Sequence, residues 1–232
     1  MEVVVVAPGV TPVDAVQPVP RSGHQRARAG SRIHAPSVPG LGLVTAVVSV
    51  AMRLGIAHHL GWAVAVTASA DHRVVDRRRL ELIEPGLPIA PVEHEAQLLD
   101  DAAATAVVTA VRSSAVTATS AALDQLAAAL PEPIVSMSLR YWPADFPDDI
   151  AAQRRPPYQA SADSVMYRQV LAELAHARGW ALHLYDARVV VSQATRALGV
   201  RADEVLSGPA ALLGPPWTRD HRMALAAAIM AG

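Results

Sequence analysis

Hydrophobic residues fall into a regular pattern from Met52 onward. Short apolar runs rich in Val, Ile and Leu, with partial alternation of apolar and polar positions, indicate β-strands. The pattern predicts strands over residues 53–57, 61–69, 73–83, 134–142 and 180–187. Because the connections "HHL" and "ADH" are short, we expect the first three strands to pair as an antiparallel meander.

Longer segments between and after the later strands predict helices. The expected helices cover residues 98–130, 161–178 and 188–199, and a last helix starts after Thr218 and runs to the end of the chain. Gly179 and Gly199 stand where helices typically end, and Thr218 is a favourable N-cap. Three strands followed by alternating helices and strands predict an α/β fold. It is a mixed five-stranded sheet, three antiparallel strands and then two parallel ones, with helices on both faces.

The first 51 residues differ from the rest of the chain. Residues 1–40 hold many of the prolines and four arginines against two acidic residues, and they show no sustained period. We interpret residues 1–51 as a disordered segment or as an extension upstream of a true start at Met52. The apolar run "GLGLVTAVVSVAM" is too short to span a membrane, so we expect no membrane partner and a cytoplasmic protein.

The composition excludes several kinds of chemistry. The chain has 52% hydrophobic and 18% charged residues, and it contains no Cys, no Lys and no Asn, so all 20 basic residues are Arg. Disulfides, thiolate metal sites, a lysine Schiff base and a P-loop lysine are therefore ruled out. A net charge of −1 gives no global attraction to nucleic acid, although a local basic patch stays open.

Three stretches carry a resemblance to a known family. They are "LGIAHHLGWAVAV" at the first two strands, "GWALHLYDARVVVSQATRALG" at the fifth strand and the helix after it, and "RDHRMALAAAI" in the last helix. With the element order, they resemble the ribonuclease H-like superfamily, and within it the RuvC-like Holliday-junction resolvases and related transposases. The resemblance covers residues 53–232 and implies a ribonuclease H-like domain over residues 52–232.

That resemblance implies a two-metal nuclease, and the sequence departs from it at the acids. Such a site needs carboxylates on the first strand, the fourth strand and the last helix, because two Mg²⁺ ions clamp the reacting phosphodiester. Here the first-strand position is Ala57, and the nearest polar groups of the fourth strand are Ser136 and Ser138. On the last helix Asp220 is kept, but Met223 replaces the second acid. One carboxylate cannot hold two Mg²⁺ ions.

A remodelled site of histidine and carboxylate is the alternative chemistry at the same sheet edge. Asp220, His58 and His221 are the catalytic candidates, and Asp220, His58 and His59 are the candidate metal ligands. Imidazole with carboxylate suits Zn²⁺, Mn²⁺ or Fe²⁺ better than Mg²⁺, so the expected cofactor is a divalent metal, Mn, Zn or Mg. Only one of two adjacent histidines can face the site, and we favour His58. The competing interpretation is structural: the helix dipole alone favours Asp220, and a histidine in a turn is often solvated.

Four further residues are candidates for binding a phosphorylated or nucleic-acid ligand: Arg73, Arg77, Arg140 and Asp186. Arg73 and Arg77 belong to "ADHRVVDRRR", which could line a basic groove or simply form a solvated edge strand. Arg140 begins "RYW", a mixture of arginine and aromatics that can stack on bases, and Asp186 ends the fifth strand.

These observations leave three functions open. The first is metal-dependent hydrolysis of nucleic-acid phosphodiesters at the remodelled His/Asp site. The second is a catalytically inactive ribonuclease H-like module that binds nucleic acid or a protein partner. The third is a hydrolase for a small phosphorylated substrate. The sequence leaves open whether the chain is an enzyme, and it does not give the oligomeric state.

Overall fold

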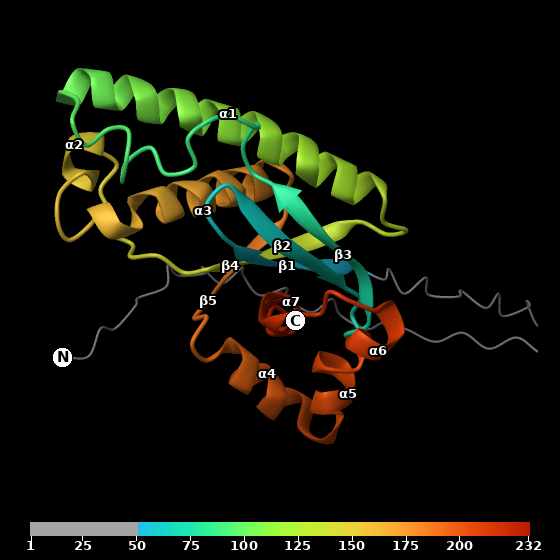
Figure 1. Ribbon diagram of the computed structural model, residues 1–232. Coiled ribbons are helices and arrows are strands. Elements are labelled where there is room, and N and C mark those ends of the chain that lie inside the picture. The colour runs from blue at the N-terminus through green and yellow to red at the C-terminus, as the bar shows by residue number, and fades with distance from the viewer. Residues whose placement is uncertain (1–50) are drawn as a thin grey trace, which may run out of the picture. The chain divides into compact units, whose positions relative to one another are not determined.

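The computed structural model describes residues 51–232, which contain a five-stranded sheet (Figure 1). The strands are β1 (Met52–His58), β2 (Trp62–Ala68), β3 (Val74–Glu81), β4 (Ile134–Arg140) and β5 (Ala181–Tyr185), in the order β3-β2-β1-β4-β5. β1 pairs antiparallel with β2, and β2 with β3, whereas β1 pairs parallel with β4, and β4 with β5. The predicted fold class is confirmed, including the pairing of the first strand with the fourth.

Helices cover both faces of the sheet (Figure 1). They are α1 (Asp101–Ala128), α2 (Ile150–Gln153), α3 (Gln159–Ala177), α4 (Val190–Leu198), α5 (Ala202–Leu206), α6 (Pro209–Leu213) and α7 (Arg219–Ile229), with a 3₁₀ turn over Gly199–Arg201. α1 and α3 pack on one face, and α7, backed by α4 and α5, packs on the other. The short helices α2, α5 and α6 were not predicted. The predicted extension over residues 1–51 falls almost wholly on residues 1–50, outside the described part, and the boundary at Met52 stays a prediction.

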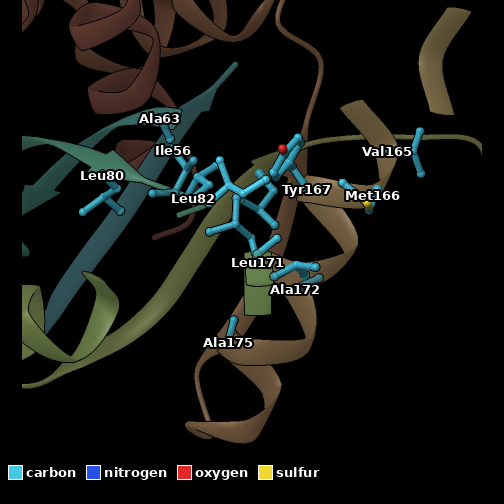
Figure 2. Packing of buried hydrophobic residues seen from close by; sticks show 14 of the residues in the cluster. Ile56, Ala63, Leu80, Leu82, Val165, Met166, Tyr167, Leu171, Ala172 and Ala175 are labelled. Atoms are coloured by element: carbon cyan, nitrogen blue, oxygen red, sulfur yellow. The ribbon is translucent and has the colours of Figure 1, made fainter. Parts of the chain in front are cut away.

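Strand alternation divides the core into two layers. Leu54 and Ile56 of β1 are fully buried in the layer under α1 and α3, whereas Ala57 belongs to the layer under α7. Figure 2 shows Ile56 of the sheet in the same cluster as Tyr167 and Leu171, which α3 contributes to the first layer. Successive residues of a strand point to opposite faces, so every second side chain of β1 supports the same helices.

The approach of α7 to β1 requires a glycine. A Cβ on Gly55 would overlap the carbonyl oxygen of Ala224 and lie 3.1 Å from the backbone nitrogen of Ala228. The helix residues at this contact, Ala224 and Ala228, also have small side chains, and both are fully buried. The sequence therefore brings α7 close to the centre of the sheet and fixes where its first turn lies.

α1 is the longest helix of residues 51–232, and by length and apolar composition it could cross a membrane. Its buried residues lie on one stripe that includes Val108, Val111, Leu123 and Leu126. This stripe packs into the same layer as α3, and 28% of the apolar window of α1 is buried among residues 51–232.

Candidate functional site

The candidate site lies where the carboxyl ends of β1, β4 and β5 meet the start of α7. Parallel pairing of β1 with β4 ends at Gly55 and Ser138, and both strands continue beyond that point. His58 is the last residue of β1, His59 begins the turn after it, and the first turn of α7 carries Asp220. Ligands of open α/β sheets typically bind at this kind of edge, just beyond the strand ends.

The structure brings His59 and Asp220 together. His59 Nε2 lies 3.0 Å from Asp220 Oδ2, and the two side chains are 40% and 28% exposed. The imidazole of His59 also stacks on the indole of Trp62, with ring centroids 4.1 Å apart and planes 10° apart. This carboxylate thus orients an imidazole that solvent reaches, an arrangement that suits proton transfer or polar binding.

His58 faces away from Asp220, so the expectation that His58 would be the histidine facing this carboxylate is wrong. The strand alternation continues through the end of β1, which places His58 on the side of Ile56 and His59 on the side of Ala57. Burial lowers the pKa of His58 to about 3, and the charges of Arg168 and Arg140 act in the same direction. His58 is therefore a neutral side chain beside arginines.

His221 serves the start of α7. Thr218 caps the helix, and the backbone N–H of Thr218 donates to Nδ1 of His221 over 3.2 Å, which completes a capping box. The side chain is 7% exposed, and burial followed by the charge of Arg77 lowers its pKa. Its geometry is that of a cap, and a catalytic role for His221 stays a prediction.

The structure does not bring the four predicted binding residues into one cluster. The Arg77 guanidinium, on β3, donates to the backbone carbonyls of the loop before α7, at Leu213, Pro215 and Pro216. Arg73 lies in the β2–β3 turn, at the end of the sheet opposite to the turn between β1 and β2.

Asp186 follows β5 and is held by its own neighbour. It accepts hydrogen bonds from the backbone and the guanidinium of Arg188, which lower its pKa to about 2. Arg140 ends β4, is exposed, and pairs in the sheet with Tyr185, the residue before Asp186. Among the described residues Arg140 forms no ion pair, so its guanidinium is available at the site edge.

Sequence reasoning missed a pocket beside the His59–Asp220 pair, which we call the Trp62 pocket. It has a volume of about 490 Å³ and is lined by Trp62, Val64, Arg77, Arg78, Arg79, Pro216, Thr218, Asp220 and His221. The guanidinium carbon of Arg79 lies 4.1 Å from the centre of the Trp62 ring. The pairing of β2 with β3, which sets Val64 opposite Arg79, was the signal that could have found it.

Arg168 was also missed. It lies on α3 among buried apolar residues and is 5% exposed. Its Nε donates to the carbonyl of Ser164 over 2.9 Å, its Nη2 to the hydroxyl of Ser164 over 2.8 Å, and its Nη1 to the carbonyl of Tyr141 over 2.5 Å. An arginine at an apolar position of the α3 stripe was the available signal.

The donor set does not fit a two-metal centre. Within residues 51–232 no three side chains of His, Asp or Glu come close enough to hold a metal ion. His59 and Asp220 are the pair that the edge offers, and they bond to each other. Ser138, on the fourth strand, contributes a buried hydroxyl that has no hydrogen-bond partner within residues 51–232, rather than a carboxylate.

Comparisons with known proteins find a distant structural similarity. No family model matches the sequence, and no curated protein matches it. Among solved structures, T. thermophilus RuvC in complex with Holliday junction substrate is similar with a TM-score of 0.42 and 13% sequence identity, over 77% of this chain and 90% of that chain. At this identity no residue role is carried over. The strand order and pairing define an α/β fold of the ribonuclease H-like class.

Proposed function

We propose that this chain is a nucleic-acid-binding module that takes up a single strand at the Trp62 pocket. The observation that carries the proposal is the lining of this pocket, where the Trp62 ring and the Arg79 guanidinium lie beside the Asp220 carboxylate. The other two lining arginines are already engaged, Arg77 by carbonyls of the loop before α7 and Arg78 by Asp76. Aromatic rings and guanidinium planes bind unstacked bases, and arginines bind phosphates in a bidentate way. Of the three functions left open by the sequence, binding without hydrolysis fits this site edge best, because the edge has too few carboxylates for a two-metal centre.

The stacking surface has a defined geometry. Trp62 is sandwiched between the imidazole of His59 and the guanidinium of Arg79. Arg79 also pairs with Glu81 over 2.5 Å, but both side chains are more than half exposed, so this ion pair is weak and exchangeable. A base can stack on the Arg79 plane or displace it from Trp62, and a single strand can present bases in this way while a duplex cannot.

Fluorescence anisotropy tests the proposal, with labelled single-stranded DNA, single-stranded RNA and the matching duplex at low and at physiological salt. We expect the single strands to bind more tightly than the duplex, with an affinity that falls as salt rises. Arg79→Gln should weaken single-strand binding several-fold and reduce the salt slope by roughly one. Absence of binding by every nucleic acid at low salt would reject the proposal.

Arg112→Gln is the matched control. Arg112 also pairs with a glutamate over 2.5 Å, but it lies on α1, which packs on the other face of the sheet. The Arg112→Gln substitution removes one positive charge from an exposed arginine–glutamate pair, as Arg79→Gln does. Equal losses for Arg79→Gln and Arg112→Gln would show that net charge, and not the Trp62 pocket, governs binding.

The His59–Asp220 pair favours a second candidate function, phosphodiester hydrolysis assisted by a divalent metal. An imidazole oriented by a carboxylate is a suitable general base, and the pair is open to solvent. Branched, duplex and single-stranded substrates incubated with Mn²⁺, Zn²⁺ or Mg²⁺ test it. Cleavage that Asp220→Asn abolishes, without loss of single-strand binding, would support hydrolysis. Absence of cleavage with every metal would reject hydrolysis and favour the binding function alone.

A further inference from the structure

A cavity lies between α4, α5 and α7, and we call it the α4–α7 pocket. It has a volume of about 540 Å³, and it shares no lining residue with the Trp62 pocket. Sites for small molecules are typically cavities of this size, with an apolar lining and a few polar groups that orient the ligand. The α4–α7 pocket is therefore large enough to hold a small molecule, and its lining indicates which kind.

The deeper part of the α4–α7 pocket is apolar. Leu206 of α5 lines it and is 5% exposed. Val191 of α4 and Met223 of α7 also line it, and both are partly buried against the same core layer as Leu206. An apolar group that packs on these three side chains leaves water, which favours binding of a ligand with an apolar body.

The outer part of the pocket carries an excess of positive charge. Three exposed arginines line it, Arg188, Arg219 and Arg222, against one carboxylate, Asp203. The guanidinium of Arg188 donates to the carboxylate of Asp186. Within residues 51–232, Arg219 and Arg222 form no ion pair. The rim of the pocket thus offers two guanidinium groups to an anion.

These two arginines and Met223 belong to one face of α7. Residues three or four apart are neighbours on a helix, so Arg219 lies next to Arg222 and to Met223. Like charges at such spacing destabilise a helix, and an anion bound between the two guanidinium groups offsets their repulsion. Met223 continues the same face from the charged rim into the apolar part of the pocket.

We propose that the α4–α7 pocket binds a small amphipathic anion, a molecule whose apolar body ends in a carboxylate or a phosphate. The body packs on Val191, Leu206 and Met223, and the anionic end pairs with Arg219 and Arg222 at the rim. Guanidinium groups match the oxygens of carboxylates and of phosphates, so both head groups share this chemistry.

This site is separate from the one proposed for a nucleic-acid strand. The start of α7 contributes Thr218, Asp220 and His221 to the lining of the Trp62 pocket, and it contributes Arg219, Arg222 and Met223 to that of the α4–α7 pocket. The proposal therefore does not depend on the proposed function, and either can fail without the other.

Ligand-detected NMR titration of the full chain tests the proposal with octanoate and octyl phosphate, which carry the same apolar body on the two head groups. We expect saturable binding of at least one of them, and the tighter of the two identifies the head group. Octanol lacks the charge, and acetate lacks the apolar body. Both should bind more weakly than the preferred octyl anion, by roughly fivefold or more.

Variants of the rim and of the apolar part locate the binding. Arg222→Gln should weaken binding of the preferred octyl anion roughly two- to fivefold, and Arg219→Gln together with Arg222→Gln roughly tenfold. Asp203→Asn should tighten it about twofold, because it removes the negative charge at the rim. Met223→Gln keeps the length of the side chain but makes it polar, and it should weaken binding several-fold while circular dichroism reports an intact fold.

Arg196→Gln is the matched control, because Arg196 is an exposed arginine of α4 that does not line the pocket. It should bind the octyl anion like the wild type, and so should Arg79→Gln, which alters the Trp62 pocket alone. Absence of binding by both octyl anions would overturn the proposal. Equal binding of octanol and the octyl anions, or equal losses in Arg222→Gln and Arg196→Gln, would also overturn it.

Discussion

The hydroxyl of Tyr185 donates a hydrogen bond of 2.7 Å to the backbone carbonyl of Ile56. Tyr185 ends β5, and Ile56 lies in β1, with β4 between these two strands in the sheet. The bond forms just past Gly55 and Ser138, the last residues through which β1 and β4 pair. The side chain thus satisfies a buried carbonyl at the point where the two strands stop pairing, and it closes the sheet behind the candidate site.

Tyr185→Phe should lower the free energy of unfolding by about 1–2 kcal/mol, because the Ile56 carbonyl loses its donor in a place that water does not reach. Tyr185 is 8% exposed, so solvent cannot replace the lost hydroxyl. Urea denaturation measures the change. Tyr141→Phe removes a hydroxyl from a side chain that is 44% exposed, and it should leave stability nearly unchanged. Equal losses in both variants would contradict this account of the bond.

Gly55→Ala should destabilise the protein by several kcal/mol or prevent folding. The added methyl group overlaps the Ala224 carbonyl, and it can fit only if α7 moves away from β1. Gly86→Ala is the comparison, because Gly86 has a φ of +89° but open space around its missing side chain. That variant should cost about 1–2 kcal/mol through backbone strain alone. Thermal denaturation of both variants separates helix displacement from strain, and a mild effect at Gly55 would contradict the close approach.

His58 should make the fold weaker in acid. The pKa of His58 is lowered from 6.5 to about 3 in the folded state, so the unfolded chain binds its proton first as the pH falls. Stability should therefore decrease between about pH 6.5 and pH 3, by up to about 1.4 kcal/mol per pH unit from this group. His58→Gln should flatten that decrease in denaturation curves recorded across the range. His94→Gln, which removes an exposed imidazole, controls for the loss of a histidine, and an unchanged slope in His58→Gln would refute the assignment.

His221→Ala should act on the helix rather than on the ligand. Removing the side chain breaks the capping box with Thr218 and should cost about 1 kcal/mol of stability. Single-strand binding measured well below the melting temperature should stay within a few-fold of the wild type. A loss of binding as large as that of Arg79→Gln, with stability preserved, would instead place His221 in contact with the ligand.

Local patterns predicted the fold well, because short turns and helical crossovers leave one arrangement of the strands. The turn between β1 and β2 allows antiparallel pairing alone, and the long α1 connection brings β4 back parallel to β1. The sequence pattern did not predict the short helices α5 and α6, because Gly208 and Gly214 interrupt the apolar pattern around them. α5 packs against α7 and α6 packs against α5, and no local signal encodes such tertiary contacts.

The candidate site was predicted in part. That a histidine of the first turn and Asp220 would meet follows from the topology, and His59 makes that contact. The choice of His58 assumed that the turn redirects a side chain, whereas the strand alternation simply continues. The Arg79–Trp62 stack depends on the exact pairing of β2 with β3, and the hydrogen bond from Arg168 to the Tyr141 carbonyl joins a helix to the segment after a strand. Such contacts between distant segments are set by tertiary packing.

Arg77 determines how wide the Trp62 pocket is. By binding the carbonyls of Leu213, Pro215 and Pro216, it joins the edge strand β3 to the loop that precedes α7, so one side chain links the two walls of the pocket. A pocket with fixed walls selects its occupant by thickness: a flat ring enters, whereas a bulky or branched group must first break the contacts of one arginine. Selectivity at this site therefore belongs to a side chain that never needs to touch the ligand.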